Sequence, residues 1–360
     1  MKTLRIPLLM LAVAALIAGI WSGFWRAGWN TPTPHPPMFD MHGALMIGGF
    51  LGALISLERA VAAKALWTYG APLLAGISTV LLLLGQILPG QILLVSSSTI
   101  LVLMSIFFVE EHPSLHMVTM GLGAVLWLAG NTLWLAGYAI NQVVLWWAAF
   151  LILTIAGERL ELSRILALKN EVKALFIMTI LILLSGMVIS TIYYSYGMRI
   201  AGLGMFLLAV WLLSYDLARK SVRRPGLTRF VAVSLITGYI WLLVAGLIAI
   251  IWGSVNMGLH YDAILHAIFV GFTFSMIFGH APIIFPGILG IKITFHPIFY
   301  LHLVVLHLSL MIRMYGDLMI HPEIRIWGSL LNGLAIVLFF GNTLMSILFL
   351  KEKSASTIKK

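Results

Sequence analysis

Long apolar stretches recur from one end of the 360-residue chain to the other, with short polar segments between them. Each stretch holds about 20 residues, the length that an α-helix needs to cross the roughly 30 Å hydrocarbon core of a bilayer. The charged residues, prolines and glycines that interrupt these stretches predict twelve helices. The predicted helices cover residues 4–24, 40–63, 67–88, 91–110, 114–137, 141–157, 173–194, 197–216, 229–252, 260–281, 297–315 and 325–350. We therefore predict an all-α, polytopic transmembrane helix bundle that forms a single integral membrane domain over residues 1–360.

The composition supports a lipid environment. Hydrophobic residues make up 61% of the chain and charged residues only 9%, whereas soluble domains carry about 25% charged residues. A net charge of +10 would suit nucleic acid, but the basic residues lie in short clusters between apolar stretches and form no basic domain. We therefore expect the lipid bilayer as the main partner and no nucleic-acid partner.

The distribution of Lys and Arg predicts the orientation, because cytoplasmic loops carry an excess of these residues. With a cytoplasmic N-terminus, the inner side holds most of the 22 basic residues, including the tail from Lys351 to Lys360. The four that remain on the outer side are Arg26, Arg199, Arg313 and Arg325. We predict a multi-pass protein of the cytoplasmic (inner) membrane with both ends inside. The first helix should stay uncleaved, because no small-x-small cleavage site closes its apolar run.

Two similar segments end predicted helices on the inner side. They are Ile55-Ser56-Leu57-Glu58-Arg59 in the second helix and Ile155-Ala156-Gly157-Glu158-Arg159 in the sixth. The spacing of four helices is compatible with an internal repeat. The alternative is that Glu-Arg pairs close the inner helix ends as ion pairs.

Histidine is the most prominent candidate for chemistry. Ionisable groups within a membrane span are costly, so each is a functional candidate. Six of the 11 histidines lie in or near the predicted second, tenth and eleventh helices, among them His260. The other five are the candidates for a site: His42, His266, His280, His302 and His307. A neutral imidazole can ligate haem iron or copper, and it can also be a satisfied polar group between helices. Cysteine is absent, which excludes thiolate ligands.

The spacing of these histidines is compatible with haem. His266 and His280 are 14 residues apart, which in a continuous α-helix is about four turns and places both side chains near one face. From their depths we expect His42 with His266 as an outer pair and His280 with His302 as an inner pair. His307 lies nearer the midplane and would serve a third centre or a copper ion. The same arrangement would also suit a proton path.

Two segments carry a resemblance to known membrane haem proteins. His42-Gly43-Ala44-Leu45-Met46-Ile47-Gly48-Gly49-Phe50 resembles the second-helix entry of the NnrS family and the corresponding stretch of haem–copper oxidase subunit I. Leu265-His266-Ala267-Ile268-Phe269-Val270-Gly271-Phe272, followed by Phe278-Gly279-His280, resembles a second region of NnrS-type proteins. The matched segments cover a small part of the chain.

The resemblance implies an inner-membrane protein that binds haem and copper and serves redox or nitric-oxide-related chemistry, including the response to nitrosative stress. It carries over His42, His266 and His280 as ligand positions, and it implies a redox partner or a quinone. The chain has no adjacent His-His pair and no His-x-His in the tenth helix. These departures disfavour an oxygen-reducing, proton-pumping oxidase.

Two other classes of function remain open. A transporter or channel would use the same histidines to line a polar or proton path. A structural or assembly subunit would use them as hydrogen-bonding groups between helices. Pro282 and Pro286 predict that the tenth helix ends near residue 281 and that an irregular connection leads to residue 297.

Overall fold

The twelve predicted spans are present in the structure. The computed structural model describes residues 2–32, 39–291 and 293–348, so the basic tail from Lys351 to Lys360 lies outside it. The described chain contains twelve helices that are long and apolar enough to cross a membrane, and it contains no strand. This confirms the prediction of an all-α, multi-pass membrane protein. Helices prevail because the hydrocarbon offers no hydrogen bonds, so the backbone must satisfy its own polar groups.

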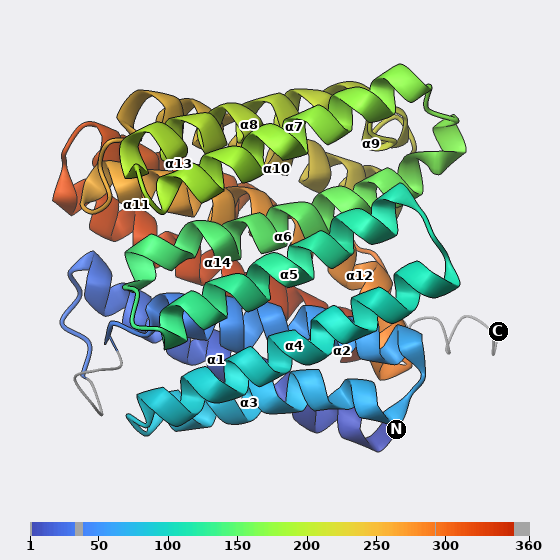
Figure 1. Cartoon of the computed structure of the whole chain (residues 1–360), viewed down its shortest axis with the longest axis horizontal. Helices are drawn as coiled ribbons and strands as arrows, with labels where there is room; N and C mark the ends of the chain where they lie inside the picture. The colour runs from blue at the N-terminus through green and yellow to red at the C-terminus, as the bar shows by residue number, and fades with distance from the viewer. Residues whose placement is uncertain (1, 33–38, 292, 349–360) are drawn as a thin grey trace. The chain divides into compact units, whose positions relative to one another are not determined.

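The chain forms two compact units, Met1–Glu161 and Leu162–Lys360. In the first unit, neighbouring helices pack in sequence order: η2 packs on α1, α3 on α4, and α4 on α5 (Figure 1). Its elements are α1 (Lys2–Ala27), the π-helix η2 (Ala44–Gly52), α2 (Ala53–Ala63), the 3-10 helix η3 (Leu66–Tyr69), α3 (Gly70–Leu83), α4 (Ile87–Glu111), α5 (Leu115–Leu135) and α6 (Ile140–Leu162).

The second unit contains the remaining six spans. Helix α7 packs on α8, α8 on α10, and α13 on α14, while α10 also contacts η5 and α12 (Figure 1). Its elements are the 3-10 helix η4 (Ser163–Leu166), α7 (Asn170–Ser190), α8 (Tyr194–Tyr215), α9 (Ala218–Ser221), α10 (Leu227–Trp252), α11 (Leu259–His266), the π-helix η5 (Ala267–Phe274), α12 (Ser275–Leu289), α13 (Phe299–Leu318) and α14 (Pro322–Leu348).

Two spans contain a π-helical stretch, and each stretch follows a candidate histidine. Residues Ala44–Gly52 form η2 shortly after His42, and Ala267–Phe274 form η5 directly after His266. A π-turn holds more residues than an α-turn, so each extra residue rotates the following side chains by about 100°. The prediction that His266 and His280 share a face assumed a continuous α-helix, and that assumption is wrong.

The tenth span also extends further than predicted. Helix α12 continues through Pro282 and Pro286 to Leu289, and Gly290 then ends it with a left-handed φ of 71°. Proline is tolerated within membrane helices because neighbouring groups and local adjustment of the helix satisfy the carbonyls it leaves unpaired. The expected helix end near residue 281 is therefore wrong.

Glycines let the two helices α7 and α8 approach until their backbones touch. A Cβ atom added at Gly186 of α7 would collide with the backbone of Ala201 in α8, and one added at Gly197 of α8 would collide with the backbone of Ser190. Small residues at such crossings permit the close packing on which helix association in lipid depends.

The variant Gly186→Ala should lower the stability of the protein by about 1–3 kcal/mol, because the added methyl group forces two backbones apart. The midpoint of thermal unfolding of the purified protein in detergent measures the effect. Gly341→Ala in α14 is the matched control, since a Cβ atom there meets no atom within 4 Å. Equal midpoints for the two variants would contradict the proposed close contact.

Candidate functional site

The five candidate histidines are distributed over both units. His42 lies just before η2 in the first unit, and the other four lie in the second unit. His266 is the last residue of α11 and His280 lies in α12, while His302 and His307 lie on α13. The predicted pairing of His42 with His266 joins residues of different units, and it stays a prediction.

Three of these imidazoles make the same kind of hydrogen bond. The Nδ1 atom of His42 lies 2.8 Å from the backbone carbonyl oxygen of Gly19. The Nδ1 atom of His266 lies 2.9 Å from the backbone carbonyl oxygen of Asp262. The Nδ1 atom of His280 lies 2.8 Å from the backbone carbonyl oxygen of Met276. A carbonyl oxygen can only accept, so Nδ1 must donate. In the neutral ring the lone pair then belongs to Nε2, the nitrogen that would face a metal.

His307 makes the opposite bond. The Trp241 indole Nε1–H donates to Nδ1 of His307 over 3.0 Å, and an indole N–H can only donate. Nδ1 of His307 therefore accepts, and the ring proton of the neutral form is on Nε2. A protonated nitrogen cannot ligate a metal, so this contact does not fit His307 as a copper ligand.

His302 resembles His307 in its hydrogen bonding. The Asn342 side-chain Nδ2 lies 3.3 Å from the Ile298 carbonyl, which fixes the amide group with its NH₂ toward the backbone. The same NH₂ lies 3.1 Å from Nδ1 of His302, so this nitrogen accepts. The proton of His302 is then on Nε2 as well, and this geometry does not fit a ligand.

Aromatic rings surround His302 in the core of the second unit. The ring centroids of four phenylalanines lie within 6 Å of its own, and Phe278 is the nearest at 4.8 Å in an edge-to-face arrangement. The four are Phe230, Phe278, Phe299 and Phe339. Edge-to-face contacts of this kind stabilise a buried ring. The surroundings of His302 favour a packing role over ligation.

The ring of His42 is packed against glycines of α1. A Cβ atom added at Gly23 would lie 2.9 Å from Cε1 of His42, and one added at Gly19 would lie 2.5 Å from the sulfur of Met46. Gly19 also supplies the carbonyl that receives the His42 hydrogen bond. The missing side chains at these two positions therefore leave room for His42 and Met46 and hold the imidazole in one orientation.

A network of buried and partly buried charges adjoins His266. The Asp262 carboxylate receives Nη2 of Arg313 at 2.7 Å and lies 3.4 Å from Nε of Arg325. Asp317, whose side chain is fully buried, lies 3.1 Å from Nε of Arg325. Nδ1 of His266 is also 3.3 Å from an oxygen of Asp262. Two arginines and two aspartates from α11, α13 and α14 thus balance one another in charge.

Close packing of α13 and α14 brings the two arginines together. A Cβ atom added at Gly328 would lie 2.5 Å from the backbone nitrogen of Arg313, and one added at Gly316 would collide with the backbone of Arg325. Arg313 and Arg325 are two of the four basic residues predicted to lie on the outer side. Arg313 is buried and Arg325 is partly buried, and both are paired with carboxylates. They are therefore structural charges as well as signals of orientation.

Sequence reasoning missed the carboxylates of this network. Asp262 precedes His266 by four residues, and Arg313 precedes Asp317 by four. Residues four apart are neighbours on a helix, so this spacing was the signal available. The ion pairs of Asp262 with Arg313 and Arg325 could not be predicted from spacing, because they depend on how α11, α13 and α14 pack in the folded protein.

The site does not fit a metal ion held by several side chains. Within the described parts of the chain, no three His, Cys, Asp or Glu side chains are close enough to hold one ion. Haem makes a smaller demand, because its iron needs only one or two axial ligands from the protein. The imidazoles of His42, His266 and His280 therefore fit haem better than copper.

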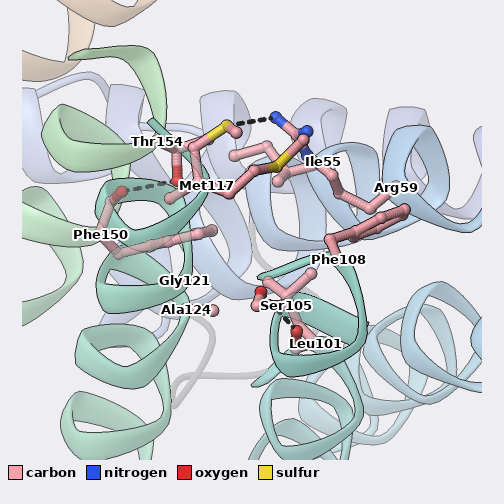
Figure 2. A pocket seen from close by; sticks show the side chains of 11 residues that line it. Ile55, Arg59, Leu101, Ser105, Phe108, Met117, Gly121, Ala124, Phe150 and Thr154 are labelled. Carbon is pink, nitrogen blue, oxygen red and sulfur yellow. Dashed lines mark hydrogen bonds between the residues drawn. The ribbon is translucent and has the colours of Figure 1, made fainter. Parts of the chain in front are cut away.

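A second feature lies in the first unit, where the two similar Glu-Arg segments meet. Nη2 of Arg59 donates to Oε1 of Glu158 at 2.7 Å and to the sulfur of Met120 at 3.0 Å. The pair therefore joins the end of α2 to the end of α6. Arg59 also lines a small cavity between α2, α4, α5 and α6, with a volume of about 20 Å³ that has room for about one water molecule (Figure 2).

Comparison with known proteins identifies the family. Residues 5–348 match the model of a family described as a domain of unknown function, DUF8744. The chain belongs to the DUF8744 family. No curated protein and no solved structure matches it significantly.

The variant Asp262→Asn should lower the stability of this DUF8744 protein by about 3–5 kcal/mol, because it leaves buried arginine charge without its partner. Thermal unfolding in detergent measures the loss. Asp40→Asn provides the same chemical change at an exposed position and should leave the midpoint unchanged. A midpoint of Asp262→Asn equal to that of the control would show that the charge network contributes nothing to stability.

Proposed function

We propose that this protein binds haem within the membrane, with Nε2 of His42, His266 and His280 as axial ligands. The observation that carries the proposal is the shared hydrogen bond from Nδ1 to a backbone carbonyl. Histidines that ligate metals almost always donate their other ring N–H to a carbonyl or a carboxylate, which fixes the ring and makes the ligating nitrogen more basic.

The surroundings of His266 support the same role. Besides its backbone hydrogen bond, the ring has the Asp262 carboxylate 3.3 Å from Nδ1, and the two arginines hold that carboxylate in place. The chain thus orients His266 through a second group that is itself anchored. An anchored acceptor increases the electron donation of an imidazole to a metal.

Haem supplies one-electron redox chemistry and can bind small gases when it is held in a protein. Together with the resemblance to NnrS-type proteins, this chemistry supports a role in redox or nitric-oxide metabolism at the inner membrane. The residues of this chain would hold the iron at fixed depths and exclude water through the apolar helices around each imidazole. Copper is not part of the proposal, because the contacts of His307 do not fit a ligand.

A proton path is the second candidate, and the charge network favours it. Asp317 is fully buried beside Arg325, and Asp262 connects the arginines to His266. Chains of acidic groups and histidines relay protons in membrane transporters. This candidate predicts proton flux in liposomes by protein that carries no haem.

The absorption spectrum of the purified protein tests the haem proposal. We expect a Soret band, with the haem content determined by the pyridine haemochrome assay. The variants His42→Gln, His266→Gln and His280→Gln should each lower the haem content or change the spectrum. His302→Gln and His307→Gln are the controls and should keep both, because their Nδ1 atoms accept hydrogen bonds.

A colourless protein would contradict the proposal. So would a haem content that falls in the two control variants and stays constant in the other three. The comparison uses one substitution at all five positions, which separates ligation from the general effect of replacing a buried histidine.

A further inference from the structure

We infer that a basic segment of the second unit, residues 217–229, binds the phosphate group of an anionic phospholipid at the membrane surface. The segment connects α8 to α10 and includes the short helix α9. It holds none of the candidate histidines, so the inference is independent of haem binding. The exposure of the basic side chains, their lack of acidic partners and the position of the segment next to two spans support it.

The basic segment presents a dense and unbalanced positive charge. Its five basic side chains are all exposed, and they are Arg219, Lys220, Arg223, Arg224 and Arg229. The sequence from residue 217 to residue 261 contains no Asp or Glu. A cytoplasmic orientation requires only an excess of basic residues in a loop, so this density of charge goes beyond what orientation needs.

The folded chain does not neutralise this charge either. Within the described residues, none of the five basic side chains forms an ion pair with a carboxylate. The carboxylate nearest in the sequence, Asp216, is only 2% exposed. It accepts hydrogen bonds from the backbone nitrogen of Ala218 at 2.7 Å and from Oγ of Ser163 at 3.5 Å. Asp216 therefore anchors the start of α9, and the basic side chains face the surroundings.

Hydrogen bonds also fix the course of the segment. Nη1 of Arg219 donates to the Ser214 carbonyl at 2.7 Å, and Nε of Arg229 donates to the Val222 carbonyl at 3.3 Å. Helix α9 contacts both α8 and α10 (Figure 1). A preformed surface loses less conformational entropy when it binds, and the planar guanidinium group matches the oxygens of a phosphate with paired N–H donors.

The position of the segment favours a lipid over a soluble partner. Helix α8 ends at Tyr215 and α10 begins at Leu227, so the short connection stays close to the membrane surface. Leu217, Val222 and Leu227 are partly buried, which holds the segment against the ends of these helices. The distribution of basic residues predicts that this end faces the cytoplasm, and anionic lipids of the cytoplasmic leaflet attract basic segments that adjoin a span.

Thermal unfolding of the full-length protein in a neutral detergent tests the inference, because a ligand that binds the folded state raises the midpoint. We expect dioleoylphosphatidylglycerol to raise the midpoint at a low ratio of lipid to detergent. The double variant Arg223→Gln with Arg224→Gln should need about tenfold more of this lipid for the same rise above its own lipid-free midpoint, because two guanidinium groups are lost. Neither side chain has a hydrogen-bond partner among the described residues, so the fold should be unaffected.

The matched control is the double variant Lys169→Gln with Lys173→Gln. It removes the same charge from exposed positions at the start of α7, where the exposed Glu171 lies between the two lysines in the sequence. The lipid requirement should stay unchanged. Dioleoylphosphatidylcholine has the same acyl chains without net charge, and glycerol 3-phosphate has the phosphate without acyl chains. Neither should raise the midpoint, and about 0.5 M sodium chloride should weaken the effect of phosphatidylglycerol by screening.

An equal rise with phosphatidylcholine would overturn the role of the lipid's charge, and an equal rise with glycerol 3-phosphate would overturn the assignment to a lipid. An unchanged lipid requirement in the Arg223→Gln, Arg224→Gln variant, or the same increase in the control variant, would overturn the location. A rise with polyglutamate and none with phosphatidylglycerol would assign the segment to an acidic protein instead.

Discussion

Hydrogen bonding in the absence of water is the constraint on which this structure depends. Within the hydrocarbon core no water is available, so a buried polar group that finds no partner in the protein costs several kcal/mol. The constraint makes each span helical. It also acts on the five candidate imidazoles, because the hydrogen-bond partner of Nδ1 decides which ring nitrogen carries the proton. Carbonyls at Gly19, Asp262 and Met276 select one form of the ring, whereas Trp241 and Asn342 select the other.

The same constraint explains where the charges lie. The buried Arg313 and Asp317 pair with the partly buried Asp262 and Arg325, and Arg59 is paired with Glu158. Buried pairs add little net stability, but removing one partner is strongly destabilising, so the helices that carry them become dependent on one another. The first network holds the acceptor beside His266. The second joins the end of α2 to the end of α6 beside a small cavity.

The twelve spans could be predicted because their length and apolar composition follow from the thickness of a bilayer. Where the structure differs from the predicted helices, the physical cause can be identified. The π-helices η2 and η5 are changes of hydrogen-bond pattern by one residue, and hydropathy does not report them. Pro282 and Pro286 lie inside α12 because the surrounding protein tolerates them. The candidate histidines could be identified from the sequence as a group. Their division into rings whose Nδ1 donates a hydrogen bond and rings whose Nδ1 accepts one could not. It depends on Trp241 and Asn342, which are 66 and 40 residues away in the chain.

Backbone carbonyls and side-chain donors divide the five candidate histidines into two classes with different chemistry. Solid-state ¹⁵N NMR of histidine-labelled protein in lipid bilayers tests it most directly, with single His→Gln variants used to assign the signals. We expect a protonated Nδ1 and an unprotonated Nε2 at His42, His266 and His280, and a protonated Nε2 at His302 and His307. The same protonation pattern at all five rings would contradict it.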